Sequence, residues 1–381
     1  LNLPFPLPNI QLFYTNHQSR AGVQRNKITG NSRSGDDWLR LKFLFMLATE
    51  VILEIKMKVD ASLVTSRHRQ ELSEWGYTVV EGVLSPEFCD SAVQQYQDWI
   101  KNNFPEGTFP TTKKSLVRST YRLGHSATSW EVRLACKPAF TELWRTDRLL
   151  TSFDSVAIGR PPEQGCEQFR SRETSWLHID QIAGPQGLHV YQGAVYLEHA
   201  AEDDWTFEVL EGSHKFFDEF WDEHPEERET SMTKGEGSSK FTPEMIEWWN
   251  KRGCQSRYVA VPKGGLVLWD SRTVHANANP VKGRANPDRW RWVLIVSMWP
   301  ASLVNQQGIE ARQQAYNTMT QTCHDLRAKV SESLELPPAR PLTELPEVAR
   351  SLDARRLAGV EPYPTGDCLD YQYTPMDRRT S

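Results

Sequence analysis

The feature that most restricts the fold is a series of short strand-like segments between about Leu149 and Trp299. The segments are rich in β-branched and aromatic residues, and Gly, Pro, Asn and Ser stand between them, as in strands separated by turns. They are SFDSVAIG, SWLHID, LHVYQGAVYLEHA, WTFEVLEGSH, RYVAVPKGGLVLWD and RWRWVLIVSMW. Many strands with few helices between them are typical of a sandwich or a barrel, so we expect a mainly β domain.

Helices flank this β region. The segment SRHRQELSEWG predicts a helix that begins near Ser66 and ends at Gly76, and YTVVEGVL after it predicts a strand. Ser85 and Pro86 have the residue types of an N-cap and a first helical turn, so PEFCDSAVQQYQDWIKNNF predicts a second helix. A helical insertion at about residues 216–252 interrupts the strands. The expected fold class is therefore mainly β with flanking helices (α+β).

Composition divides the chain into three parts. Residues 1–56 are loop-like at first and then contain one apolar helical candidate from Trp38 to Ile55. We expect them to be an N-terminal appendage, disordered or not native to the folded unit. Residues 57–335 are expected to form the main domain, and residues 336–381, rich in Pro and Arg, a tail that is extended on the surface or partly disordered.

Charge and cysteine content narrow the class of protein. The net charge of −5 and the isoelectric point near 6.1 provide no overall basic field. This disfavours a dedicated nucleic-acid binder but leaves room for a local basic groove. Six cysteines at long, irregular spacings are typical of reduced intracellular thiols rather than of a disulfide framework.

No segment predicts a membrane span or a sorting signal. The longest apolar stretch, FLFMLATEVILEI, contains Glu50 and Glu54 and is too short to cross a bilayer. It also lies too deep in the chain to be a secretory signal peptide. The final Arg-Thr-Ser is not a peroxisomal signal. We therefore expect a soluble, intracellular protein, in the cytoplasm by default.

The segment SWLHIDQ contains a candidate metal-binding pair, His178 and Asp180. Residues two apart on a strand point to the same side, so these side chains can face one pocket while Leu177 and Ile179 face the opposite layer. An imidazole nitrogen and a carboxylate oxygen supply two of the three ligands of a two-histidine, one-carboxylate site. A single His-x-Asp is more often incidental, so the hypothesis needs a third ligand on a neighbouring strand.

Among the ten histidines, His275 is the strongest candidate for that third ligand, because it stands at the far end of the strand predicted by PKGGLVLWDSRTVH. His189 and His199 lie too close to the first pair along the chain. His214 belongs to EGSHK, which predicts a turn. Taken alone, His275 would be interpreted as a surface histidine at a strand end.

Two arginines after His275 are candidates for binding an anionic cosubstrate. In DRWRWVLIVSMW, Arg289 and Arg291 lie on the same side of the predicted strand. An arginine at the mouth of a strand suits a bidentate contact with a carboxylate. The alternatives for Arg291 are a salt bridge or a cation–π contact with Trp290 or Trp292.

With these segments in this order, the sequence resembles the phytanoyl-CoA dioxygenase-like (PhyH) family of Fe(II)/2-oxoglutarate-dependent oxygenases. The resemblance covers roughly residues 68–300. It is carried by YTVVEGVLSPEFCD, His178-x-Asp180, FEVLEGSHK, GGLVLWDSRTVH and RWRWVLIVSMW. It implies a double-stranded β-helix, which is a jelly-roll or cupin-like barrel, with helices packed outside it.

The resemblance also implies the site and its cofactors, Fe(II) and 2-oxoglutarate. The implied metal ligands are His178, Asp180 and His275. The C5 carboxylate of 2-oxoglutarate would bind Arg291, with Arg289 as the alternative. Gln192, on the strand after the metal pair, would face the pocket and contact cosubstrate or substrate. Ascorbate is a further candidate cofactor.

The implied reaction is oxidation of a C–H bond in a small or medium-sized organic substrate, with O2 consumed and succinate and CO2 released. Members of the family that halogenate lack the carboxylate ligand, so Asp180 favours hydroxylation or a related oxidation. Phytanoyl-CoA itself is not favoured, because the sequence shows neither a peroxisomal signal nor an evident pocket for the CoA phosphates.

Two alternatives stay open. Some phytanoyl-CoA-dioxygenase-like proteins modify a methylated base in DNA, which would need a basic groove, and the acidic total counts against one. The residues that would form such a groove are Lys113, Lys114, Arg118 and Arg122. The other alternative is a non-catalytic jelly-roll binding module, against which the complete set of three ligands and a matching arginine argues.

Overall fold

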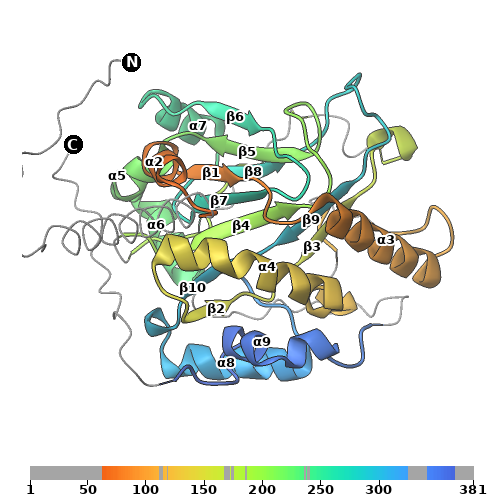
Figure 1. Ribbon diagram of the computed structural model, residues 1–381. Helices are drawn as coiled ribbons and strands as arrows, with labels where there is room; N and C mark the ends of the chain where they lie inside the picture. Colours follow the sequence, from red (N-terminus) through yellow and green to blue (C-terminus); the bar gives the residue numbers. More distant parts are fainter. Residues whose placement is uncertain are drawn as a thin grey trace, which may run out of the picture. The chain divides into compact units, whose positions relative to one another are not determined.

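The computed structural model describes one part of the chain, shown in Figure 1. The described residues are 62–110, 115–117, 119–166, 172, 176–184, 187–235, 237, 241–324 and 341–364. The chain divides into two units, Leu1–Ala61 and Ser62–Ser381, and every described residue belongs to the second. The predicted appendage at residues 1–56 therefore lies outside the described residues.

Helices and strands occur in runs along the described chain, with most strands grouped before and after helices α5 to α7. The helices are α2 (Ser66–Trp75), α3 (Pro86–Asn103), α4 (Ala127–Trp144), α5 (Phe217–Glu223), α6 (Pro225–Lys234), α7 (Pro243–Asn250), α8 (Gln306–Thr318) and α9 (Leu352–Leu357). The strands are β1 (Tyr77–Val80), β2 (Leu149–Thr151), β3 (Val156–Gly159), β4 (Tyr191–Tyr196), β5 (Thr206–Leu210), β6 (Ser256–Val259), β7 (Leu266–Asp270), β8 (His275–Ala278), β9 (Arg291–Ile295) and β10 (Met298–Pro300).

Helix α2 ends, and helix α3 begins, where the sequence predicts. Helix α2 ends at Gly76, whose φ of 85° places it in the left-handed region that glycine enters without strain. At α3 the side chain of Ser85 accepts a hydrogen bond from the backbone N–H of Phe88, and Pro86 occupies the first turn.

The strands form two antiparallel sheets. The larger sheet has the order β1-β7-β4-β10-β2, and β9 joins it by pairing with both β4 and β3. The smaller sheet has the order β6-β5-β8. Both are visible in Figure 1, with β5, β6 and β8 forming the upper layer.

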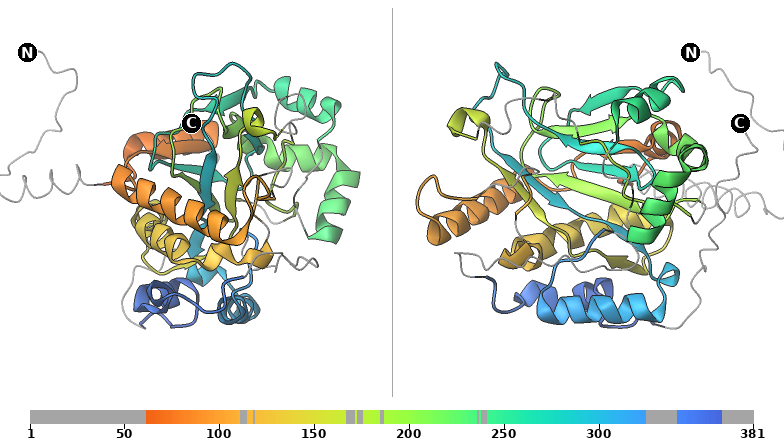
Figure 2. Two further views of the ribbon diagram at one scale, coloured as in Figure 1. Left: turned by 90° about the vertical axis from the view of Figure 1, so that its right-hand side faces the viewer. Right: turned by 180° about the vertical axis from the view of Figure 1, so that it is seen from behind.

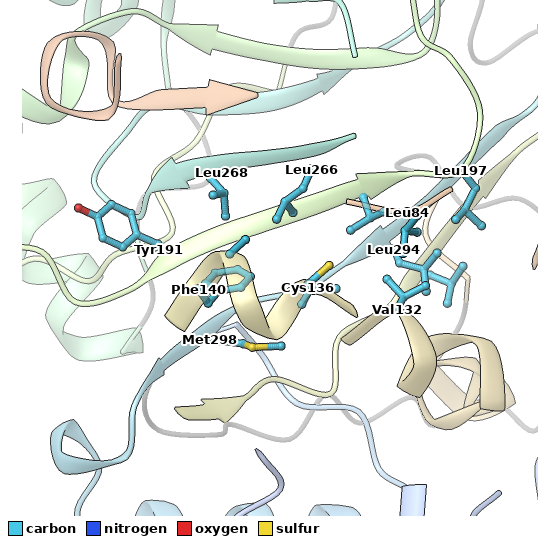
Figure 3. Close-up of a cluster of buried hydrophobic side chains, with 14 of the residues drawn as sticks. Leu84, Val132, Cys136, Phe140, Tyr191, Leu197, Leu266, Leu268, Leu294 and Met298 are labelled. Atoms are coloured by element: carbon cyan, nitrogen blue, oxygen red, sulfur yellow. The ribbon is translucent and has the colours of Figure 1, made fainter. Parts of the chain in front are cut away.

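Alternation along the strands separates the core into layers on the two faces of the larger sheet. On β7, Leu266 and Leu268 belong to the cluster that packs against α4, whereas Val267 and Trp269 belong to the cluster between the two sheets. Figure 3 shows the first cluster, in which side chains spaced four residues apart on α4 face the sheet. Those α4 side chains are Val132, Cys136 and Phe140.

The helical insertion covers the outer face of the smaller sheet. Aromatic residues of α5 and α7 pack there, including Phe220 and the fully buried Trp249. Leu177 and Ile179 belong to the same cluster. The insertion predicted at about residues 216–252 thus corresponds to helices α5, α6 and α7.

Two antiparallel sheets with helices on their outer faces confirm the expected fold class, a double-stranded β-helix of the jelly-roll or cupin-like type. None of the helices in the described part of the chain is long and apolar enough to span a membrane. The domain boundaries at residues 56 and 335 stay predictions.

Part of the predicted Pro/Arg-rich tail is folded. Residues 341–364 are described, and they contain the short helix α9. Ala349, Ala354 and Ala358 pack in one cluster with Trp130 of α4 and Tyr316 of α8. Figure 2 shows α8 and α9 together at one end of the domain, beyond β2 and β10.

Candidate metal centre

The predicted pair His178 and Asp180 lies on an extended segment that touches the smaller sheet at one point. Residue 178 forms an isolated antiparallel bridge with His275, the first residue of β8. The backbone N–H of His178 donates to the carbonyl of His275 at 3.0 Å, and that of His275 donates to the carbonyl of His178 at 2.9 Å. The sequence predicts a strand here, but the chain then turns away, since the N–H of Gln181 donates to the carbonyl of Ser271.

Alternation still decides which way the side chains point. Leu177 and Ile179 are buried against the helical insertion, so His178 and Asp180 point to the opposite side. This arrangement agrees with the prediction from the sequence. Gly237 contributes to it, because its backbone lies against the backbone of residues 179 and 180.

The structure brings the three predicted ligands together. One nitrogen of His178, one nitrogen of His275 and one oxygen of Asp180 all lie within 4.8 Å of one another. His178 Nε2 is 3.3 Å from Asp180 Oδ1, and His275 Nε2 is 3.2 Å from Asp180 Oδ2. Two imidazole nitrogens and one carboxylate oxygen form a donor set that suits a divalent transition metal.

Packing and a hydrogen bond orient the two imidazole rings. His275 Nδ1 donates to the carbonyl of Thr273 at 3.0 Å, which orients the ring so that Nε2 lies toward Asp180. The His275 ring packs 5.0 Å from the Trp269 ring and 5.6 Å from the Phe207 ring, measured between centroids. Trp176 stacks on His178 with a centroid separation of 4.4 Å.

Two further side chains bind the carboxylate of Asp180. Gln192 Nε2 donates to Asp180 Oδ2 at 3.0 Å, so this predicted residue lies beside the three candidate ligands. His324 Nε2 is 2.9 Å from the same oxygen. His324 stands after α8 in a segment without a recognisable motif, and the sequence offers no signal for its role.

Neighbouring charges determine the protonation of Asp180 and His324. Burial alone would raise the pKa of Asp180, but the neighbouring His324 and His178, through charge and hydrogen bonding, hold it well below its usual range. Burial alone would lower the pKa of His324, but the carboxylates of Asp180 and Asp154 raise it well above its usual value. Asp180 is therefore ionised at neutral pH, as a metal ligand must be.

The structure separates the two candidate arginines. Arg291 begins β9 and is buried on the inner side of the larger sheet, where its guanidinium donates to the Ser115 hydroxyl at 2.6 Å and to the Asn277 side chain. Arg289 precedes the strand and forms an ion pair with Asp204 at 3.1 Å. Asn277 is two residues after His275 on β8, so it faces the same side.

Tyr196 lies beside Arg291 and is a further polar residue of the interior. Among the described residues its hydroxyl has no hydrogen-bond partner, although the side chain is buried. Burial raises the pKa of Tyr196 to about 12, against the opposing effect of the Arg291 charge. Tyr196, Ala194 and Gln192 alternate along β4 and face the same side, a periodic signal that could have identified Tyr196 from the sequence.

The basic groove required for DNA has little support among the described residues. Lys113, Lys114 and Arg118 lie outside them. Arg122 is described, and its guanidinium donates to the backbone carbonyl of Leu342 at 3.0 Å. This arginine therefore joins the loop before α4 to the C-terminal segment.

A jelly roll in which two histidines and one carboxylate converge has the ligand set typical of one class of protein, the non-haem metal oxygenases. The chain belongs to the phytanoyl-CoA dioxygenase (PhyH) family, which matches residues 72–279, more than half of its length. The family is described as phytanoyl-CoA dioxygenase, so the chain is an oxidoreductase in general class.

Individual proteins share a low sequence identity with this chain. The Ava biosynthesis cluster protein O of Aspergillus versicolor is 27% identical over 290 residues, which cover 71% of this chain and 91% of that protein. The crystal structure of GlcNAc Inducible Gene 2 (GIG2) from Candida albicans is 14% identical with a TM-score of 0.57, over 82% of this chain and 80% of that one. The latter similarity supports the fold.

A crystal structure of EctD from S. alaskensis with 2-oxoglutarate and 5-hydroxyectoine is 12% identical, with a TM-score of 0.43. The match covers 65% of this chain and 79% of that one.

Proposed function

We propose that this protein is an Fe(II)- and 2-oxoglutarate-dependent dioxygenase that hydroxylates, or otherwise oxidises, a C–H bond of a small or medium-sized organic substrate. The observation that carries the proposal is the convergence of His178, Asp180 and His275, whose ligand atoms lie within 4.8 Å of one another. Membership of the PhyH family supports the same assignment.

In this proposal His178, Asp180 and His275 would hold Fe(II). The bound iron, with 2-oxoglutarate and O2, supplies the oxidation of a C–H bond and the release of succinate and CO2. The Thr273 carbonyl keeps His275 in the tautomer that presents Nε2. The ionised Asp180 supplies the negative charge that divalent iron requires.

Arg291 is the proposed partner for the C5 carboxylate of 2-oxoglutarate. Its guanidinium is buried between the sheets, where a charge-assisted bidentate contact is strong. Tyr196 offers a hydroxyl beside it, and Gln192 lies at the metal end of the same strand. Ala194 stands between Gln192 and Tyr196 on β4 and faces the same side as both. Arg289 is less suited, because Asp204 already neutralises it.

A small organic molecule is preferred to DNA as substrate. The relative that is 27% identical is described as a protein of a biosynthesis cluster, which supports a biosynthetic metabolite. The net charge of −5 and the contact of Arg122 with Leu342 both weaken the basic groove that DNA would need.

The proposal is tested by metal binding and by turnover. The wild-type protein should bind one equivalent of Fe(II) without oxygen, and in air it should convert 2-oxoglutarate slowly to succinate even without its substrate. His178→Ala should lose both properties. His199→Ala removes an exposed histidine outside the cluster and should retain both. A wild-type protein that neither binds iron nor forms succinate would contradict the proposal. If it is active, a screen of metabolites and methylated DNA would identify the substrate class.

A further inference from the structure

His324 lies on a short segment that is attached to the strand region by its own hydrogen bonds. The N–H of Thr322 donates to the carbonyl of Phe153 at 3.2 Å, and the N–H of Phe153 donates to the Thr322 hydroxyl at 2.9 Å. The hydroxyl of Ser155 donates to the side-chain oxygen of Gln321 at 3.2 Å. These contacts hold the segment after α8 against the residues between β2 and β3, so the position of His324 is determined by the backbone.

The imidazole of His324 stands between two carboxylates. Its Nε2 is 2.9 Å from Asp180 Oδ2, and its Nδ1 is 3.4 Å from Asp154 Oδ1. A carboxylate oxygen accepts hydrogen bonds, so the ring serves as donor toward Asp180. Asp154 is buried, and its charge also stabilises the buried guanidinium of Arg133 on α4. The His324 ring therefore contacts Asp154 through Nδ1 and the candidate metal ligand Asp180 through Nε2.

The carboxylate of Asp180 depends on side-chain partners for its orientation, because no strand ladder includes this residue. It lies outside any strand, two residues beyond the single bridge at His178. Its Oδ2 is the oxygen that both Gln192 and His324 approach. Two donors on one carboxylate oxygen restrict the rotation of the group and leave the other oxygen available to a metal.

We propose that His324 is a positioning residue for Asp180: it holds Oδ2 through Nε2, while Asp154 fixes the orientation of its ring. The inference rests on the proposed function, since it treats Asp180 as a metal ligand. His324 lies outside residues 72–279, which match the family, and it is not a member of the converging ligand set. The role therefore belongs to this chain's C-terminal segment and is distinct from metal ligation.

The test compares metal affinity in the wild type and four variants by anaerobic titration with Co(II), followed through its visible absorption. The variants are His324→Ala, His324→Gln, Asp154→Ala and His178→Ala. His324→Ala removes the donor, and we expect metal binding about 10- to 100-fold weaker than in the wild type, the usual effect of losing a residue that supports a ligand. His324→Gln retains a side-chain N–H donor and should recover most of the affinity. Asp154→Ala frees the ring and should weaken binding roughly tenfold or more.

The outcomes separate this inference from the proposed function. If the wild-type protein fails to bind Co(II), the metal site itself is wrong. If the wild type binds and His178→Ala does not, the site stands, and equal affinity in His324→Ala and the wild type then overturns the inference. Loss in His324→Gln as severe as in His324→Ala also overturns it, because the donor would not be the relevant property. Thermal unfolding without metal identifies a variant that fails to fold, and His324→Gln then decides.

Discussion

His178 and His275 are paired through their backbones, and each donates its N–H to the carbonyl of the other at 3.0 and 2.9 Å. Their ring centroids are consequently only 4.3 Å apart. Residues directly opposite each other in an antiparallel pair have adjacent side chains, so the backbone sets the separation of the two imidazoles. The third group, Asp180, follows two residues later on the same side. This pairing explains how segments distant in the sequence form one donor set.

Arg291, the first residue of β9, and Arg289, which precedes that strand, should differ in their effect on the cosubstrate. Arg291→Lys replaces a planar bidentate donor by a single ammonium, so we expect the KM for 2-oxoglutarate to rise about 10- to 100-fold. Arg289→Gln should change this KM little, because Arg289 pairs with Asp204 and Arg284 also contacts that carboxylate. Steady-state succinate formation measures both. A larger effect in Arg289→Gln would reverse the assignment.

Tyr196→Phe should raise the stability of the protein and weaken cosubstrate binding. The Tyr196 hydroxyl is buried and has no partner among the described residues, and such a group costs about 1–3 kcal/mol. Removing it should therefore raise the free energy of unfolding of the ligand-free protein, by about 1 kcal/mol, in urea denaturation. The same variant should bind 2-oxoglutarate several-fold more weakly in calorimetry. Unchanged cosubstrate affinity would show that the hydroxyl does not contact it.

Even a methyl side chain at position 237 should disturb the neighbouring backbone. A Cβ at this position would lie 1.7 Å from the carbonyl oxygen of Ile179 and 2.8 Å from the carbonyl carbon of Asp180. Gly237→Ala must therefore displace the segment that carries two candidate ligands, with a cost of about 1–3 kcal/mol in unfolding free energy and weaker metal binding. Thr233→Ala, at an exposed position of α6, is the matched control and should leave metal binding unchanged. Equal metal affinity in both variants would contradict the expected displacement.

Stability should fall in acid because of His125. Burial lowers its pKa to about 3 from an ordinary value of 6.5, and the neutral ring bonds the carbonyl of Thr320. Below pH 6.5 the unfolded chain binds a proton that the folded protein does not, so the stabilisation is complete above that pH and declines as the pH falls toward 3. The slope from this group is at most about 1.4 kcal/mol per pH unit.

Urea denaturation between these pH values tests the contribution of His125 directly. His125→Gln retains a donor for Thr320 but does not titrate, so its unfolding free energy should decline less steeply with falling pH than that of the wild type. Parallel slopes in the two proteins would assign the acid sensitivity to other groups.

Local patterns account for much of what the sequence predicts correctly. The helix that ends at Gly76 and the helix that begins after Ser85 depend on capping chemistry within a few residues. The side to which His178 and Asp180 point depends on alternation with the apolar Leu177 and Ile179, a pattern that holds although the segment makes only one bridge. Such features arise between neighbours in the chain, and residue type is enough to predict them.

The resemblance prefers Arg291 to Arg289, and the sheet supplies the physical difference between them. Alternation places both on one side, so the sequence cannot rank them from periodicity. Pairing with Gly159 shows that β9 begins at Arg291, which puts that guanidinium in the interior and leaves Arg289 to Asp204. Gln192 is different, because its position on the predicted strand after the metal pair already singled it out, and in the structure it donates to Asp180.

The sequence by itself determined the chemistry that the site has available, because two histidines, an aspartate and an arginine on predicted strands restrict the ligands they can hold. Tertiary structure alone decided how those groups meet and which others join them. His324 reaches Asp180 only because hydrogen bonds between Thr322 and Phe153 fasten the segment after α8 to the residues before β3. Contacts between segments far apart in the chain carry no local periodicity, so no pattern within the sequence predicts them.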